Sequence, residues 1–167
     1  MAILAGQGPK RMAAVVSRSI VQAFFEAYSA RDAAAVGMLL ADDVEWTMAG
    51  PVDVFPFCGV RRGRDAVLDS IFRIKPGMLS VTRTEVDRIL IDGESAGAFS
   101  RITAVHAKSG RTLSYHCAHF LVFRDSRLIA FEVVTDTFGI AEQVLGHRID
   151  AFRTPEQHDN DDTLVML

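Results

Sequence analysis

The second half of the chain carries the pattern that most limits its fold. Four segments, at about 79–91, 96–107, 112–124 and 127–136, are rich in β-branched and aromatic residues and have the length of strands. The short joints between them read DGES, KSGR and RDSR, and joints of this kind are typical of hairpins. The sequence therefore predicts a four-stranded antiparallel meander.

The first half predicts helices and one further strand. Apolar residues recur at helical spacing over about 12–30, a short helix capped by Asp32 is predicted up to Leu40, and a third is predicted over about 64–74. The stretch DDVEWTM alternates in polarity and predicts a strand, and the apolar loop 49–59 behind it is expected to fold over other apolar groups. Helices followed by an antiparallel sheet are typical of the α+β class.

A chain of 167 residues is long enough for one domain. We expect that domain over residues 12–147, with a short last helix at about 138–145, between an N-terminal extension (1–11) and a polar C-terminal tail (148–167). The strand predicted at 112–124 is apolar on both faces, so the sheet needs cover on both sides. Helices can cover one face and a second copy of the chain the other, which predicts a homodimer.

Charge and composition disfavour several classes of function. The formal net charge is -3, whereas nucleic-acid binding needs an excess of Lys and Arg on one face; the basic RRGR at 61–64 is expected in a solvated loop. No apolar run is long enough to span a membrane, and no His, Cys or carboxylate cluster has metal spacing, so no membrane, metal or cofactor is predicted. Cys58 and Cys117 sit among apolar residues, and the N-terminus lacks the order of a secretory signal. Both features favour a cytoplasmic location.

Three segments carry a family resemblance, in one order along the chain: VQAFFEAYSARDAAAVGMLLADDVEW, GVRRGRDAV and HFLVFRDSRLIAFEVVTDTFGIAEQVLG. Through them the chain resembles the SnoaL-like branch of the nuclear transport factor 2-like (ketosteroid-isomerase-like) superfamily over most of residues 20–146. The resemblance implies a curved antiparallel sheet wrapped around a long N-terminal helix, a cone whose mouth holds small hydrophobic ligands. It does not fix the reaction, because this fold hosts isomerases, dehydratases, cyclases, hydrolases and binding modules.

The residues of the steroid isomerases are absent. Aligned through the ADD signature and the HF pair, their Tyr and their two Asp positions fall on Phe24, Met48 and Ala118. Apolar side chains can neither take a proton nor donate a hydrogen bond to an enolate oxygen. A limonene-type epoxide hydrolase is also disfavoured, since Arg101 lies close to its arginine but its catalytic Asp falls on Val133.

Two residues are candidates for acid/base chemistry. Asp136 occupies a context similar to that of the catalytic aspartate of SnoaL-like cyclases, but it also fits the N-cap of the last helix, and both interpretations stay open. His116 shares strand parity with Ala118 and is expected to face the cavity, either as a proton shuttle or as a bonded structural histidine. His119 has the opposite parity and is expected at the dimer face.

The expected pocket is largely apolar, with Arg101 as a charged member whose partner would be Glu132 or a ligand carboxylate. The predicted lining residues are Phe24, Tyr28, Trp46, Met48, Phe57, Phe72, Arg101, Ala118, Phe120 and Phe131. The prediction is a pocket for a small hydrophobic, polyketide- or steroid-like molecule, with cofactor-free cyclisation, isomerisation or dehydration by one acid/base residue. The alternative is a non-catalytic ligand-binding or dimerisation module of the same fold.

Overall fold

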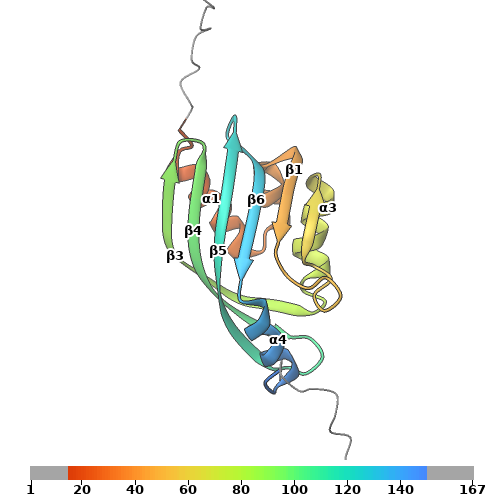
Figure 1. Cartoon of the computed structure of the whole chain (residues 1–167). Helices are drawn as coiled ribbons and strands as arrows, with labels where there is room; N and C mark the ends of the chain where they lie inside the picture. The colour runs from red at the N-terminus through yellow and green to blue at the C-terminus, as the bar shows by residue number, and fades with distance from the viewer. Residues whose placement is uncertain (1–14, 150–167) are drawn as a thin grey trace, which may run out of the picture.

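The computed structural model describes residues 15–149 (Figure 1). The predicted N-terminal extension and nearly all of the predicted tail lie outside the described residues. The elements are, in order, α1 (Arg18–Ala30), α2 (Ala33–Leu39), β1 (Leu40–Met48), β2 (Gly59–Arg62), α3 (Arg64–Asp69), the π-helix η1 (Ser70–Ile74), β3 (Leu79–Asp92), β4 (Ser95–His106), β5 (Thr112–Arg124), β6 (Arg127–Thr135) and α4 (Thr137–Leu145).

The strands form one six-stranded sheet in the order β2-β1-β6-β5-β4-β3. The predicted antiparallel meander is confirmed in β3 to β6. The sheet is extended by β1, which pairs with β6 in parallel, and by β2, which pairs with β1 antiparallel. The expectation of a loop at residues 61–64 is therefore wrong for Arg61 and Arg62, which lie in β2. A strand of four residues with two arginines gives too little pattern to predict.

Side-chain caps set the beginnings of the first two helices. Ser17 Oγ accepts a hydrogen bond from the N–H of Ile20 (3.3 Å), and Asp32 Oδ1 accepts one from the N–H of Ala35 (2.9 Å). The Asp32 cap is as predicted. The first helix begins later than the expected residue 12, because Ser17 caps it and the N–H of Val16 binds the carbonyl of Gly93 instead (2.9 Å).

The curved, unclosed sheet wraps around α1, which lies behind it in Figure 1, and the cone-shaped α+β fold is confirmed. We call the face that packs on α1 the inner face and the opposite one the outer face. At the centre, the ring of Phe24 meets that of Phe131 edge to face, with 5.2 Å between centroids. The apolar loop also turns inward as predicted, since Phe55 and Phe57 are both buried.

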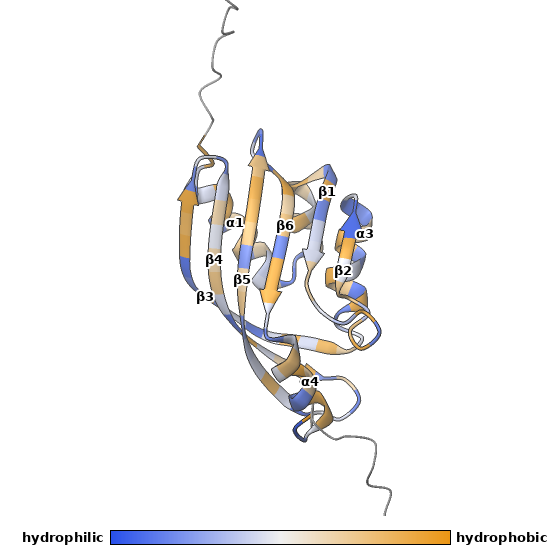
Figure 2. Ribbon diagram, in the orientation of Figure 1, coloured by the Kyte–Doolittle hydropathy of each residue, from blue (hydrophilic) through white to orange (hydrophobic). Residues whose placement is uncertain are grey.

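The parity of β5 is opposite to the prediction. Its inner residues are Leu113, Tyr115, Cys117, His119, Leu121 and Phe123, all buried, whereas its outer residues are Ser114, His116, Ala118, Phe120 and Val122. His116, Ala118 and Phe120 were expected to face the cavity and lie on the outer face instead. Ala118 was placed in the cavity because an alignment without gaps put a family site residue at this position. His116 and Phe120 were placed there because they lie on the same side of the strand as Ala118. In Figure 2 both β5 and β6 are hydrophobic over much of their length, in keeping with a sheet that is apolar on both sides.

Candidate functional site

Six side chains with polar atoms converge on the inner face of the sheet near the end of α1. We call them the interior cluster: Tyr28, Lys75, Ser100, Tyr115, Cys117 and His119. Strands β4 and β5 supply four of them at alternate positions, which places those four on one face. Tyr28 comes from α1 and Lys75 follows η1. The cluster therefore joins the sheet to α1 and to the end of η1.

Lys75 is the charged residue of the cluster and is only 4% exposed. Its backbone N–H binds the carbonyl of Ser70 (3.0 Å), the bond that closes the π-turn of η1. One extra residue in a turn rotates the next side chain by about 100° around the helix axis. The π-turn thus accounts for a lysine that points into the protein at the end of an otherwise amphipathic helix.

Two effects act on the pKa of Lys75 in opposite directions. Burial lowers it, whereas Tyr28, Tyr115 and Cys117 in their ionised forms raise it, helped by a hydrogen bond to Tyr28, and the raising effects prevail. Burial also raises the pKa of Tyr115 and of Cys117. At neutral pH these two neighbours therefore stay protonated, so neither supplies a negative charge next to Lys75.

His119 is fixed by its ring and by one nitrogen. Its Nε2 lies 2.8 Å from Ser100 Oγ, and its imidazole stacks on Phe131, with 5.7 Å between ring centroids and 21° between the planes. Burial lowers its pKa to about 3, and the charge of Lys75 adds to the shift. The imidazole is therefore neutral near pH 7, and its Nδ1 is buried without a hydrogen-bond partner.

A second atom of the cluster lacks a partner. Tyr115 Oη has none although the residue is only 5% exposed; outside the cluster, Trp46 Nε1 has none on β1, which β6 separates from β5. Buried polar groups in native proteins are nearly always hydrogen-bonded. Tyr115 Oη and His119 Nδ1 leave hydrogen-bonding capacity unused within the interior cluster, and Arg64 Nε and Ser70 Oγ are further buried atoms without a partner.

A small cavity adjoins the cluster. It has a volume of about 10 Å³ and is lined by Tyr28, Arg31, Ile71, Lys75, Val81, Thr84 and Ile102. This is room for about one water molecule. A larger ligand can enter only when rim side chains move, and two of the lining residues, Tyr28 and Arg31, are partly open to solvent.

Asp136 is the N-cap of α4. Its Oδ1 accepts a hydrogen bond from the N–H of Gly139 (2.9 Å), and the residue is exposed at the end of β6. Of the two interpretations of this residue, the structure confirms the cap. An acid/base role stays a prediction, and it gains no support from a carboxylate that faces solvent.

His116 and Arg101 meet on the outer face, away from the interior cluster. The Nε–H of Arg101 donates to His116 Nε2 (3.4 Å), and the ring of His116 stacks on Phe99 at 5.3 Å. Both residues are exposed. The expectation that they line the pocket is wrong in its placement, and so is the pairing of Arg101 with Glu132, because Arg101 takes His116 from the adjacent strand.

The remaining predicted lining residues divide between core and outer face. The buried ones are Phe24, Trp46, Met48, Phe57 and Phe131, while Tyr28 and Phe72 are half-buried beside the cavity rim. Ala118 and Phe120 belong to the outer face. Sequence reasoning missed Lys75, Tyr115 and His119 as site residues. A signal for the two strand residues existed in the alternation of β5. The alternate residues from Leu113 to Phe123, which include Tyr115 and His119, are more apolar than the alternate residues from Ser114 to Arg124.

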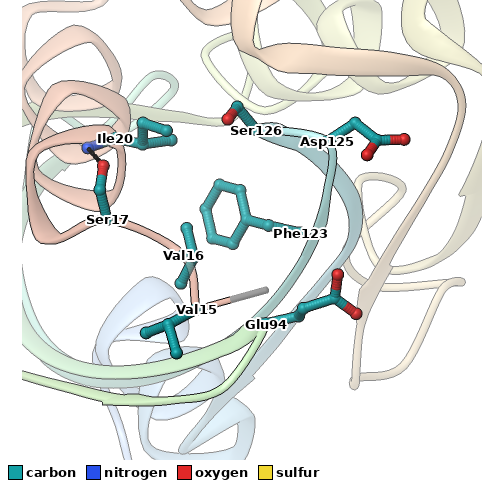
Figure 3. A pocket seen from close by; sticks show the side chains of 8 residues that line it. All are labelled: Val15, Val16, Ser17, Ile20, Glu94, Phe123, Asp125 and Ser126. Atoms are coloured by element: carbon teal, nitrogen blue, oxygen red, sulfur yellow. Dashed lines mark hydrogen bonds between the residues drawn. The ribbon is translucent and has the colours of Figure 1, made fainter. Parts of the chain in front are cut away.

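Two other hollows lie on the surface. A groove of about 430 Å³ lies where α1 begins, with the ring of Phe123 between Val16 and the β5–β6 turn and with Glu94 and Asp125 at its edge (Figure 3). Another, of about 320 Å³, lies on the outer face around Phe99 and Phe120. The lining of the first contains no residue of the interior cluster, whereas the lining of the second includes His119 beside Ala118 and Phe120.

Metal and membrane sites do not compete with this cluster in the described part of the chain. Among residues 15–149, no group of three or more His, Cys, Asp or Glu side chains could hold a metal ion. Within the same residues, no helix has the length and apolarity needed to cross a membrane.

Comparison with known proteins identifies a family. The model of the SnoaL-like domain matches residues 21–131. A provisionally assigned isomerase from Rhodopseudomonas palustris is 30% identical to this chain, with a TM-score of 0.66, and the match covers 77% of this chain and 94% of that chain. The search of curated proteins found no match.

Two more solved structures share the fold at lower identity. An NTF2-like protein from Burkholderia pseudomallei is 24% identical, with a TM-score of 0.69, over 75% of this chain and 95% of that chain. TerC, co-crystallised with polyporic acid, is 18% identical, with a TM-score of 0.69, over 76% of this chain and 96% of that chain. Likeness at this level of identity shows the cone-shaped fold and no more.

Proposed function

This chain belongs to the SnoaL-like family of the nuclear transport factor 2-like superfamily, and from that premise we propose that its interior cluster binds a small hydrophobic molecule. The observation that carries the proposal is the pair of buried atoms without partners, Tyr115 Oη and His119 Nδ1. An unpaired buried polar group costs about 1–3 kcal/mol. A ligand oxygen that reaches both atoms recovers this free energy, which favours binding at this place.

The walls around the cluster suit an aromatic or polycyclic ligand. Phe24, Phe25 and Phe131 pack around His119 and one another, with 5.2–5.7 Å between ring centroids. Ligand sites are typically apolar cavities with a few polar groups that fix orientation. TerC, which shares the fold, has been co-crystallised with polyporic acid, so an organic acid is one ligand associated with a protein of this shape.

The same groups favour polarisation of a ligand oxygen over removal of a proton. His119, with a pKa of about 3, is too weak a base at neutral pH, and burial keeps the proton on Tyr115 by raising its pKa. Neutral donors in a dry interior stabilise a developing negative oxygen. Isomerase- or cyclase-like turnover at this site depends on His119 and Tyr115 as hydrogen-bonding groups.

A thermal-shift screen of naphthalene derivatives that carry a carbonyl or hydroxyl group tests the proposal. Compounds that raise the Tm of the wild type are expected to bind Tyr115→Phe at least tenfold more weakly, because the variant removes only the hydroxyl. His116→Phe, on the outer face, is the control and keeps wild-type binding. A compound that binds Tyr115→Phe as well as the wild type, but loses affinity in Ala118→Glu, would assign binding to the outer face and overturn the proposal.

We also propose that two copies of the chain pair through the outer face. Four large apolar residues are exposed there: Leu90, Phe99, Phe120 and Val134. Leu90, Phe99 and Phe120 line the groove of about 320 Å³ on that face. A contiguous exposed apolar patch of this kind is typical of an interaction surface, and a symmetric pair of sheets covers it with the same residues from both copies.

A cytoplasmic location is part of the proposal. Both cysteines are free, buried thiols, and burial raises the pKa of Cys58 to about 11. Protonated, buried thiols are inert structural groups, which fits a reducing compartment. Cell fractionation should recover the protein in the cytosol, and its recovery outside the cytoplasm would contradict this location.

A further inference from the structure

The charged residues that line the cavity beside the interior cluster are all basic. Its apolar walls are Ile71, Val81 and Ile102, and its polar walls are Tyr28, Arg31, Lys75 and Thr84. Two of the polar groups are cations and two carry hydroxyls, and none of the seven lining residues is acidic. The cavity therefore presents hydrogen-bond donors and positive charge to whatever enters it.

Neither cation has a carboxylate partner among residues 15–149. The described ion pairs involve other arginines, and Arg31 and Lys75 take part in none of them. Three acidic residues near the cavity in sequence are engaged elsewhere: Asp32 caps α2, Asp69 pairs with Arg73, and Glu85 pairs with Arg83. The positive charge at this cavity is thus left without a counter-charge from the protein.

The two cations are held in place by contacts that do not neutralise them. The guanidinium of Arg31 lies over the ring of Phe72, 5.7 Å from its centroid, which keeps it at the rim. Lys75 is 4% exposed and shares the cavity wall with Tyr28. A buried cation without a counter-charge is strongly unfavourable unless an anion completes the site.

We propose that this cavity, bounded by Tyr28, Arg31, Lys75 and Thr84, binds a carboxylate group of the ligand, so that the ligand is a small aromatic or polycyclic carboxylic acid. This inference rests on the proposed function of the interior cluster and specifies the ligand class. The volume of about 10 Å³ admits one oxygen atom, which meets the ammonium of Lys75. The guanidinium of Arg31 at the rim then reaches the second oxygen, and the apolar walls contact the carbon framework.

A matched pair of probes tests the charge requirement: 2-naphthoate and its neutral isostere 2-naphthamide, titrated by calorimetry at pH 7.5 and constant ionic strength. The wild type is expected to bind the naphthoate at least tenfold more tightly than the naphthamide. In Lys75→Met this preference should fall below twofold, and in Arg31→Gln it should fall severalfold. Lys108→Met, the same change at an exposed lysine on the β4–β5 turn, should keep the wild-type preference.

The outcomes separate the two proposals. Equal binding of both probes by the wild type, unchanged in Lys75→Met, overturns the carboxylate site and leaves the interior pocket in place. Failure of the wild type to bind either probe, or any compound of the thermal-shift screen, overturns the interior pocket itself. Arg31 is half-buried at the rim, so Arg31→Gln gives the answer even where Lys75→Met fails to fold.

Discussion

Ser100 Oγ and His119 Nε2 lie 2.8 Å apart on neighbouring strands, and this contact leaves His119 Nδ1 as the free polar atom of a buried imidazole. Ala98 on β4 lies opposite His119 on β5, and Ser100 is the next residue of β4 on the inner face. The hydroxyl therefore fixes the orientation of the ring. Since burial holds the pKa of His119 at about 3, the ring is a neutral hydrogen-bonding group throughout the physiological range.

His119 should make the protein less stable in mild acid. Its pKa falls from 6.5 to about 3 on folding, so between these values the unfolded chain binds a proton that the folded chain does not. The free energy of unfolding should then decrease as pH falls below 6.5, by up to about 1.4 kcal/mol per pH unit from this residue. Urea denaturation of the wild type and of His119→Gln at pH 5.0 to 7.5 measures it. An equal pH slope in both proteins would rule out the neutral buried histidine.

Lys75→Met should stabilise the protein while it removes the preference for a carboxylate ligand. Replacing a buried ion by an apolar residue of similar volume is often neutral or stabilising, here by about 1–3 kcal/mol, because the charge has no carboxylate partner. Chemical denaturation at pH 7 gives the difference from the wild type, with Lys108→Met as the matched control. A loss of more than about 1 kcal/mol would show that Lys75 has a structural role instead.

Asp136→Ala should destabilise the protein by about 1 kcal/mol, because it removes the cap of α4. Asp136→Asn retains an oxygen acceptor and should be close to wild type. Ligand affinity and turnover of any substrate found should be unchanged in Asp136→Asn. A large loss of turnover in this variant, without loss of stability, would restore the acid/base interpretation of Asp136.

Phe120→Glu should convert the proposed dimer to a monomer, because it places a charge in the middle of the outer face. Sedimentation equilibrium of the wild type and the variant measures the mass of each. Met38→Glu is the control, since Met38 is 71% exposed and lies on α2, outside the sheet. A wild type that sediments as a monomer would refute the pairing of sheets.

Most of the fold could be predicted from the sequence because its signals are local. Hairpin turns and alternating apolar residues locate β3 to β6 within a few residues, and Asp32 and Asp136 cap the helices that they were expected to begin. The pairing of β1 with β6 and the strand β2 depend on contacts between distant segments. No local pattern specifies such contacts.

The candidate site was harder to predict for two physical reasons. The period of a strand is two residues, so an error of one position in the alignment of β5 assigns every side chain to the wrong face. His116 was therefore expected inside the cone, where His119 lies, and the expected pocket residues of β5 lie on the outer face. Lys75 precedes Pro76 and Gly77 at the end of a helix, a context in which a lysine is normally solvated. Its burial follows from the π-turn of η1, which the sequence pattern does not reveal.

The central claim, that ligands bind inside the cone at the interior cluster, is tested most directly by an NMR titration with 2-naphthoate. The measurement uses protein with 15N-labelled backbone, histidine and lysine side chains. The account predicts that the largest shift changes fall on the His119 imidazole, the Lys75 ammonium and the backbone of Tyr115. Shift changes confined to the outer face around Phe99 and Phe120, with the His119 and Lys75 signals unmoved, would contradict it.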